Sequence, residues 1–325
     1  MNPLHQILEA FNQEHLLFPP YIAAFQEIDG LLGFYRETGV AQHLLVLGES
    51  GTGKTTLCHD LLKKYPRFVL PSHDVVPALH VPIPSAATIA SVTETMLAKL
   101  RDPSPTTGTV SVKTARTIKL ARALKVEILL FDEAQHIQDR GGLPTRYLVG
   151  DWLKTVVDEV NVPTVLLGLP RTEQLLQVNE QLRRRFSRRR NLQMGKDAET
   201  SIETECLQLF VSLGATLPLL IRPGNYSWDE LGSRIYYACD GRVGYVKKLL
   251  AGAIRIAMEQ DCQEINPNIL EEAFTRDVWW EGVGPLNPFN PHFRARRLTA
   301  ANEPFERGQM GVRRAYRRSK DDPSN

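Results

Sequence analysis

Four short apolar runs recur along the first two thirds of the chain, separated by segments with a different period. Each run is apolar at nearly every position and bounded by polar or turn-forming residues, which is typical of strands buried on both faces of a parallel sheet. Between the runs, apolar residues recur three and four apart, as on the buried side of a helix. This alternation across residues 40–195 predicts an α/β fold with one parallel sheet sandwiched between helices. The runs are QHLLVL at 42–47, ALHVPIP at 78–84, VEILLFD at 126–132 and VPTVLLGLP at 162–170.

Helical periods continue after residue 195, but the strand-like runs do not. Four segments carry the helical period, namely ETECLQLFVSL, WDELGSRIYYA, YVKKLLAGAIRIAMEQ and NPNILEEAFT. They predict a smaller helical domain. We therefore expect a helical N-terminal extension at 1–40, an α/β domain at 41–195, a helical domain at 196–280 and a tail at 281–325.

The expected tail has no sustained apolar period and carries the basic excess of the chain. From Gly282 to Asn325 there are nine Lys or Arg against four Asp or Glu, a local net charge of +5, whereas the whole chain has +2. We expect this segment to be disordered or only partly ordered. It is either a solubilising end or a docking segment for a partner protein or for DNA phosphates.

Composition adds few further constraints. A chain of 325 residues has room for two domains, and its four cysteines, at 58, 206, 239 and 262, lack the paired spacing of a metal site. Free thiols fit a reducing cytoplasm. The opening MNPLHQILEAFNQEH has no basic leader with an apolar centre, and no apolar stretch is long enough to cross a bilayer. We therefore expect a cytoplasmic protein with no membrane partner.

The most specific motif follows the first apolar run. The stretch GESGTGKTT at 48–56 joins that predicted strand to a predicted helix and has the spacing G-x-x-x-x-G-K-[ST]. Glycines at 48, 51 and 53 let backbone N–H groups fold around phosphate oxygens, and the helix N-terminus favours negative charge. A glycine-rich turn with this spacing by chance is the alternative, and the flanking strand and helix disfavour it. The motif predicts a nucleotide site formed by Gly48, Glu49, Ser50, Gly51, Thr52, Gly53, Lys54, Thr55 and Thr56, with Lys54 at the β- and γ-phosphates and Thr55 at Mg²⁺.

Two acidic residues end the third apolar run, in VEILLFDEAQHI. We expect Asp132 to hold the magnesium ion, directly or through water. Glu133 is then placed to orient or deprotonate the attacking water. Two carboxylates at a strand end could instead cap the next helix, but the Lys54 motif makes the metal and water roles the better interpretation.

Two arginine- and lysine-rich segments are candidates for nucleic acid or subunit contacts. The predicted helix at 111–125 has a basic polar face, which is either simply solvated or, if the protein encircles nucleic acid, contacts phosphates. The second segment, RRRFSRRR at 183–190, places six arginines in eight residues at the end of a helix predicted through residues 171–190. It is either a basic surface patch or a source of a cation for a neighbouring subunit. The candidate DNA-contacting residues are Lys113, Arg116, Lys119 and Arg122 on the helix, and Arg146.

Four segments together carry a resemblance to a known family: the Lys54 motif, FDEAQHI, NEQLRRRF and the later GRVGYVKKLL. Through these segments the chain resembles AAA+ ATPases, and within them the TniB/TnsC transposition regulators. The resemblance covers about residues 15–280. It implies an ATP- and Mg²⁺-dependent protein that binds double-stranded DNA and assembles with itself as a hexamer or heptamer ring or as a helical filament. Such proteins connect a TniQ-like target-selection protein to the transposase, and some belong to CRISPR-associated transposons. The basic tail would then capture one of these partners.

The resemblance also implies residue roles. Arg183, Arg184 or Arg185 would act as the arginine finger in the neighbouring subunit's site. Arg242 in GRVG would be the second sensor on the helical lid at 196–280, with Lys247 in reserve. One departure concerns the end of the fourth apolar run, where many AAA+ enzymes have Asn, Thr or Ser near the γ-phosphate but this chain has Gly168, Leu169 and Pro170. Slow, regulatory hydrolysis is therefore expected, unless another residue fills the role.

Two other functions fit part of the sequence. A different AAA+ ATPase, such as an ExeA-like protein or a relative of replication initiators or clamp loaders, would share the nucleotide motifs. A nucleotide-bound scaffold that hardly hydrolyses ATP would share them as well. Absence of a membrane span disfavours the ExeA-like alternative, and absence of a visible winged-helix segment disfavours an initiator.

Overall fold

The centre of the protein is a five-stranded parallel sheet. The computed structural model describes residues 3–13, 18–71, 74–85, 87–139, 143–194, 201–215, 217 and 219–306. Every pair of neighbouring strands in this sheet is parallel, which confirms the predicted α/β class. In spatial order the strands are β4 (Ala78–Pro82), β5 (Ile128–Asp132), β6 (Thr164–Gly168), β1 (His43–Leu47) and β7 (Arg188–Asn191).

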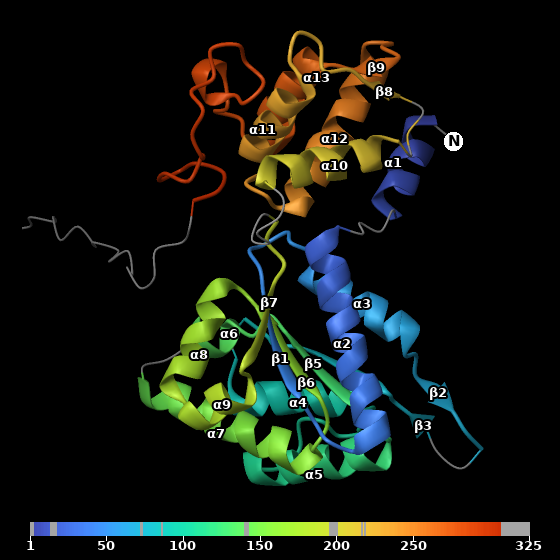
Figure 1. Ribbon diagram of the computed structural model, residues 1–325. Helices are drawn as coiled ribbons and strands as arrows, with labels where there is room; N and C mark the ends of the chain where they lie inside the picture. The colour runs from blue at the N-terminus through green and yellow to red at the C-terminus, as the bar shows by residue number, and fades with distance from the viewer. Residues whose placement is uncertain are drawn as a thin grey trace, which may run out of the picture.

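Helices cover both faces of the sheet (Figure 1). Side chains alternate between faces along a strand, so Leu44 and Val46 pack with one set of helices, while Leu45 and Leu47 pack with the other. The first face is covered by α2 (Pro19–Thr38) and α3 (Lys54–Lys64). The second is covered by α4 (Ile89–Lys99), α5 (Val110–Ala123), α7 (Leu143–Val160), α8 (Glu173–Val178) and α9 (Glu180–Arg185), with the short α6 (His136–Asp139) after β5.

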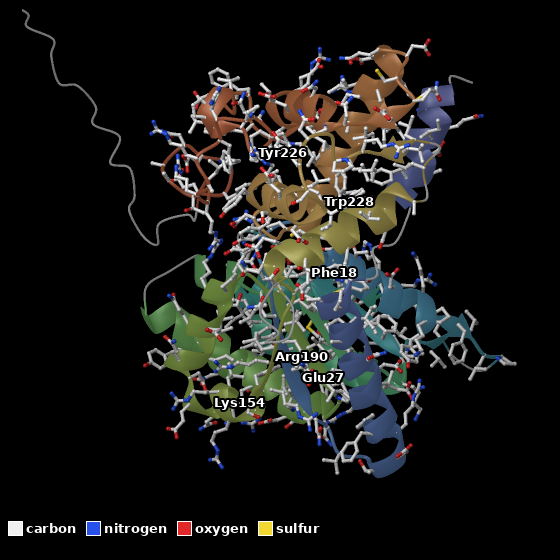
Figure 2. The ribbon with its side chains drawn as sticks, turned by 45° about the horizontal axis from the view of Figure 1, so that its top comes forward. Phe18, Glu27, Lys154, Arg190, Tyr226 and Trp228 are labelled. Atoms are coloured by element: carbon white, nitrogen blue, oxygen red, sulfur yellow. The ribbon has the colours of Figure 1, made fainter. Side chains whose placement is uncertain are left out.

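The prediction of one long helix through residues 171–190 is wrong, because this range forms two short helices, α8 and α9, and the fifth strand, β7. A 3-10 turn (Pro170–Thr172) leads into α8, and Asn179 separates α8 from α9. The Asn179 side chain accepts N–H bonds from Gln181 and Leu182, both at 3.1 Å, so it caps a new helix. The arginines of β7 are tolerated because the strand lies at the sheet edge, where Arg190 pairs with Glu27 of α2 (Figure 2).

A helical lid, within residues 201–278, lies beyond one end of the sheet (Figure 1). The amphipathic helix α12 (Val243–Glu259) lies at its centre and buries Val246, Leu250 and Ile254. Helix α1 (Pro3–Gln13) packs on α12 through Leu8 and Phe11. The lid contains α10 (Ile202–Gly214), α11 (Trp228–Cys239), α12 (Val243–Glu259), α13 (Pro267–Ala273) with a π-helical turn (Phe274–Val278), and two parallel strands, β8 (Leu220–Ile221) and β9 (Glu264–Ile265). A small antiparallel hairpin, β2 (Phe68–Val69) and β3 (Asp74–Val75), follows α3.

Residues 281–306, the first part of the expected tail, are packed against the lid. Phe289, Leu298 and Phe305 are each at most 1% exposed. The Asn287 amide is buried and donates hydrogen bonds to the carbonyls of Glu271 and Gly282, both at 2.9 Å. The segment anchors through single large side chains and side-chain hydrogen bonds, which leave no periodic signal in the sequence. The rest of the expected tail, 307–325, lies outside the described residues.

Candidate functional site

Residues 48–55 lie at the base of the candidate site and are called the Lys54 loop below. They comprise the loop between β1 and α3 and the first two residues of α3. Gly51 and Gly53 have φ of 81° and 91°, a conformation that costs a residue with a side chain about 1 kcal/mol or more. Gly53 is also the N-cap of α3, so the unpaired N–H groups of the first helical turn lie at the loop. Gly48 donates its N–H to Gly168 of β6 at 3.0 Å, which fixes the loop to the sheet. The backbone is therefore shaped to present N–H groups to an anion.

The Lys54 side chain lies inside this loop. Its Nζ donates hydrogen bonds to the carbonyls of Gly48, at 2.9 Å, and Glu49, at 3.0 Å. Burial lowers the pKa of Lys54, while the negative charges of Glu133, Asp132 and Glu49 act in the opposite direction. The only partners of the ammonium group in the described chain are these carbonyl oxygens, and a phosphate oxygen is a stronger acceptor for it.

Asp132, at the end of β5, meets the start of α3. Its Oδ2 accepts a hydrogen bond from the Thr55 hydroxyl at 2.8 Å. Burial by itself would raise the pKa of Asp132, but the contacts with His80 and Thr55 outweigh burial and lower it. The carboxylate is thus ionised beside a hydroxyl, and these two oxygen donors suit Mg²⁺.

His80 of β4 is a neighbour of Asp132 that the sequence analysis did not identify. Its Nε2 lies 3.5 Å from Asp132 Oδ2. The only sequence signal is a lone histidine inside an apolar strand run. Cys58 of α3 lies on the same side, and ligand atoms of Cys58, His80 and Asp132 are all within 4.8 Å of one another. Burial raises the pKa of the Cys58 thiol, which disfavours the thiolate that would bind a metal.

Glu133 turns away from the sheet immediately after Asp132. Its φ is +58°, unusual for a residue with a side chain, and its N–H donates to Asp132 Oδ1 at 2.9 Å. The Gln135 amide donates a hydrogen bond to the Glu133 carboxylate. Gln135 is 2% exposed, and it too was not identified from the sequence. The structure thus brings Lys54, Thr55, Asp132 and Glu133 to the carboxyl end of the parallel strands, where α/β proteins bind ligands.

The lid touches the Lys54 loop directly. Gly244, in the first turn of α12, donates its N–H to the Gly51 carbonyl at 2.7 Å. A cavity beside this contact is lined by residues of α2, the loop and the lid, and Tyr21 closes one side by packing its ring on Gly53. The Tyr21 hydroxyl donates to Asp60 at 2.5 Å, which holds the ring in place. The lining residues are Phe18, Tyr21, Gly51, Gly53, Thr56, Val243, Gly244 and Lys247.

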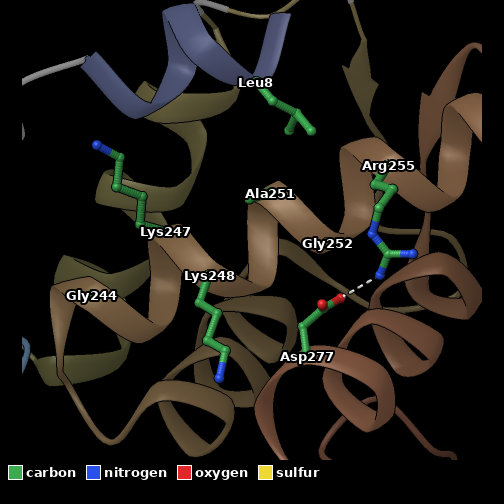
Figure 3. Close-up of a pocket in the computed structure, with 8 residues that line it drawn as sticks. All are labelled: Leu8, Gly244, Lys247, Lys248, Ala251, Gly252, Arg255 and Asp277. Atoms are coloured by element: carbon green, nitrogen blue, oxygen red, sulfur yellow. Dashed lines mark hydrogen bonds and ion pairs between the residues drawn. The ribbon is translucent and has the colours of Figure 1, made fainter. Parts of the chain in front are cut away.

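The two candidate sensors on the lid are placed differently. Arg242 is buried, 3.6 Å from Asp240, and its guanidinium lies over the Phe305 ring at 5.3 Å. It does not line the cavity beside the Lys54 loop, whereas Lys247 does. Lys247 also lines a second pocket between α1 and α12, together with Lys248 and Arg255 (Figure 3). Of the two candidate sensors, the reserve residue Lys247 therefore lies at the cavity beside the Lys54 loop, and Arg242 does not.

The three candidate finger arginines also differ. Arg185 forms a two-pronged ion pair with Asp158 of α7, at 2.7 and 2.8 Å, within its own chain. Arg183 and Arg184 are exposed, and neither has a side-chain partner among the described residues. Arginines 183 and 184 are thus free to reach a neighbouring molecule, whereas Arg185 is occupied.

The basic face of α5 is largely neutralised, which was not expected. Lys113 is buried and pairs with Glu94 at 2.5 Å, and Arg116 pairs with Asp102 at 2.8 Å. Arg122 pairs with Glu159 at 3.1 Å, so only Lys119 remains exposed without a partner in the described chain. Three of the four basic residues on this face are therefore paired within the chain. The side chain of Arg146 lies outside the described residues, although its backbone belongs to α7.

Comparison with known proteins adds a family match and several structural similarities. Residues 8–194 match the family described as bacterial TniB protein. No curated protein is significantly similar in sequence. Solved structures of similar fold include three archaeal proteins.

The first is Cdc6p from Pyrobaculum aerophilum, with 15% identity and a TM-score of 0.59 over 82% of this chain and 69% of that one. The ORC1 protein of Aeropyrum pernix, solved in complex with DNA, has 15% identity and a TM-score of 0.57 over 80% and 65%. The ORC2 protein of Aeropyrum pernix, solved as ADPNP–ADP complexes, has 14% identity and a TM-score of 0.54 over 78% and 68%. None of the described helices is long and apolar enough to span a bilayer.

Proposed function

Since the chain belongs to the TniB family of bacterial proteins and has the AAA+ fold, we propose that it is an ATP-hydrolysing regulator of DNA transposition. The observation that carries the proposal is the convergence of Lys54, the Thr55–Asp132 pair and Glu133 at one end of the sheet. These are the groups that hold a triphosphate, a magnesium ion and an attacking water in nucleoside triphosphatases of this kind. A turn that merely caps α3 would not need a buried lysine and an ionised aspartate.

Each residue has a distinct role in the proposed reaction. The Lys54 loop binds the phosphates through its N–H groups, and Lys54 exchanges its carbonyl partners for phosphate oxygens. Thr55 and Asp132 would hold magnesium, which when bound neutralises charge on the phosphates. Glu133 orients the attacking water and accepts its proton, as the water oxygen bonds to the γ-phosphorus and the bond to ADP breaks.

The cavity between α2 and the lid is the proposed site of the adenine base. Phe18 and Tyr21 offer aromatic surface, and Val243 of the lid faces them. Because the cavity contains residues of the loop, α2 and α12, a bound nucleotide would link the lid to the sheet. The proposed domains are therefore an ATPase domain at 41–195 and a lid at 196–280, to which 281–306 is attached, and an N-terminal extension at 1–40.

We further propose that Arg183 or Arg184 completes the nucleotide site of a neighbouring copy. Both are exposed and lie on α9, and an arginine supplied in trans stabilises charge at the transferred phosphoryl group. Assembly of a ring or filament then depends on ATP, because binding that occurs only in the assembled state favours that state. The assembly is proposed to form on double-stranded DNA, mainly through phosphate contacts.

The proposed biological role is supported by the family match. Such an assembly, present with ATP and released by hydrolysis, can connect a target-selection protein to the transposase. Capture of either partner by residues 307–325 is a prediction on residues that the structure does not describe. The proposal names these partners only by class: a target-selection protein and a transposase, which in some members of the family are associated with CRISPR guidance.

Turnover of ATP by purified protein, with and without duplex DNA, tests the proposal. We expect turnover that rises with DNA and a loss of about 10²- to 10⁴-fold in Glu133→Gln, since that carboxylate acts as the base. The variant should also stay longer on DNA, because assemblies then fail to disassemble. If the wild-type protein binds ATP but hydrolyses it no faster than the Glu133→Gln variant, it is the nucleotide-bound scaffold instead. DNA binding should weaken steeply with salt, and a flat response would exclude mainly phosphate contacts.

A further inference from the structure

Gln135 connects Glu133 to the end of strand β6. Its Oε1 accepts the backbone N–H of Leu169 at 3.0 Å, and its Nε2 donates to the Glu133 carboxylate. We propose that Gln135 is the positioning residue that holds the Glu133 carboxylate for catalysis, in place of a polar residue at the end of β6. This inference rests on the proposed ATP hydrolysis for its kinetic consequences, but the contact itself can be tested without nucleotide.

The Gln135 amide satisfies both contacts at once, through its oxygen and its nitrogen. The Leu169 N–H is a donor, so the group that faces it must accept, and the Glu133 carboxylate is an acceptor, so the group that faces it must donate. These requirements also fix the orientation of the amide. Glutamate at 135 would keep the acceptor but place a second carboxylate against Glu133, and methionine would keep the length but lose both bonds.

The end of β6 is shaped around this amide. A Cβ atom added to Gly168 would lie 3.0 Å from Gln135 Oε1 and 2.3 Å from the Thr172 hydroxyl oxygen. Any larger residue at 168 would therefore displace Gln135 or the turn after β6. Gln135, which follows the neighbouring strand β5, therefore fills the space that a side chain at the end of β6 could otherwise occupy.

Glu133 needs such a restraint because its backbone is fixed but its side chain is not. The turn is held by hydrogen bonds from Ala134 N–H to Leu167, at 2.8 Å, and from His136 N–H to Glu133, at 3.0 Å. The Glu133 side chain is 40% exposed, and His136 Nε2, at 3.9 Å, is too distant for a hydrogen bond. Among the described residues, the Gln135 amide is therefore the donor placed to orient the carboxylate, and it leaves the other carboxylate oxygen for water.

Two variants at this position separate positioning from folding. Gln135→Met should lower kcat for ATP roughly 10- to 100-fold, because a misplaced base loses about that factor, while KM stays within about twofold. Gln135→Glu should lower kcat similarly. Hydrogen exchange at the Leu169 amide, measured without nucleotide, should accelerate in Gln135→Met but stay slow in Gln135→Glu, which keeps the acceptor. Gln208→Met, on the exposed side of α10, is the matched control and should change none of these.

The outcomes are distinguishable. Wild-type kcat in Gln135→Met, or equal Leu169 exchange in that variant and the wild type, overturns the inference. A lower kcat, a higher KM and a lower melting temperature together in both variants would also overturn it, since that pattern indicates a structural role only. A wild-type protein without ATP turnover would instead refute the proposed function, and the exchange experiment would still decide whether Gln135 holds β6.

Discussion

Gly244 of the lid donates its backbone N–H to the Gly51 carbonyl of the Lys54 loop at 2.7 Å. The contact is so close that a Cβ atom added to Gly244 would lie 2.9 Å from the carbonyl oxygen of Gly51 and 3.1 Å from the Cα of Gly51. Both atoms belong to the backbone and cannot rotate away. The lid therefore rests directly on the loop that is proposed to hold the phosphates, and lid position and nucleotide binding should depend on each other.

Gly244→Ala tests this dependence. The added methyl group should push the lid away from the loop, and because overpacking costs about 1–3 kcal/mol, ATP binding should weaken roughly tenfold or more. Equilibrium titration with a fluorescent ATP analogue measures the effect. Gly33→Ala in α2 is the matched control, since a Cβ there meets nothing within 4 Å, and it should leave affinity unchanged. Equal affinity in both variants would show that the contact does not influence the site.

Lys247 and Arg242 should respond differently to replacement by alanine. Lys247→Ala removes a long basic side chain that lines the cavity beside the Lys54 loop and should weaken ATP binding, with a smaller effect on melting temperature than Arg242→Ala. Arg242→Ala removes a buried partner of Asp240, which keeps its bond to Arg297 at 2.7 Å, and should lower stability by about 1–3 kcal/mol. Thermal unfolding and ATP titration of both variants provide the comparison. The reverse pattern would restore Arg242 as the lid sensor.

The arginines of α9 can be separated by mixing two inactive proteins. Glu133→Gln lacks the base but keeps its arginines, whereas Arg183→Ala or Arg184→Ala lacks the finger but keeps its base. If one of these arginines acts in trans, mixing that variant with Glu133→Gln should restore part of the ATP turnover. Arg185→Ala is the control and should lose at most about 1 kcal/mol of stability, because its pair with Asp158 is partly exposed. Failure of every mixture to recover activity would argue against a shared site.

His43 predicts a loss of stability in mild acid. Burial at the start of β1, and next the nearby charge of Arg185, lower the pKa of His43 to about 4, although Asp158 opposes the shift. The ring packs against Phe186. As the pH falls from about 6.5 to 4, the unfolded chain binds this proton and the folded chain does not, so folding should weaken by about 3 kcal/mol. Denaturant unfolding at pH 7.5 and 5 measures the decrease in the free energy of unfolding. This decrease should be smaller in His43→Gln than in the wild type, and the same as in the wild type in the exposed control His292→Gln.

The sequence predicts the parts of the site that local chemistry determines. The strand before Gly48 and the helix after Gly53 have clear periods, and the glycine spacing requires the backbone conformation that Gly51 and Gly53 adopt. The third strand run ends at Asp132, as the sequence analysis expected. The roles of these residues remain predictions, but their proximity follows from the parallel order of the strands.

Other features depend on contacts between distant segments. Strand β7 forms from an arginine-rich sequence because an edge position and acidic neighbours such as Glu27 accommodate it. Gln135 meets the Leu169 N–H only because β5 lies beside β6. Lys113 looks like a solvated cation until Glu94 of α4 is brought against it. A single sequence does not contain these pairings in a form that periodicity or spacing can reveal.

The central claim is that nucleotide, DNA and assembly depend on one another. Sedimentation velocity of the full chain with short duplex DNA, Mg²⁺ and a non-hydrolysable ATP analogue tests it most directly, beside samples that lack one component. The account predicts large, defined assemblies only when all three components are present, and their loss when Arg183 and Arg184 are both replaced by alanine. A protein that stays monomeric with all components at saturating concentration would contradict it.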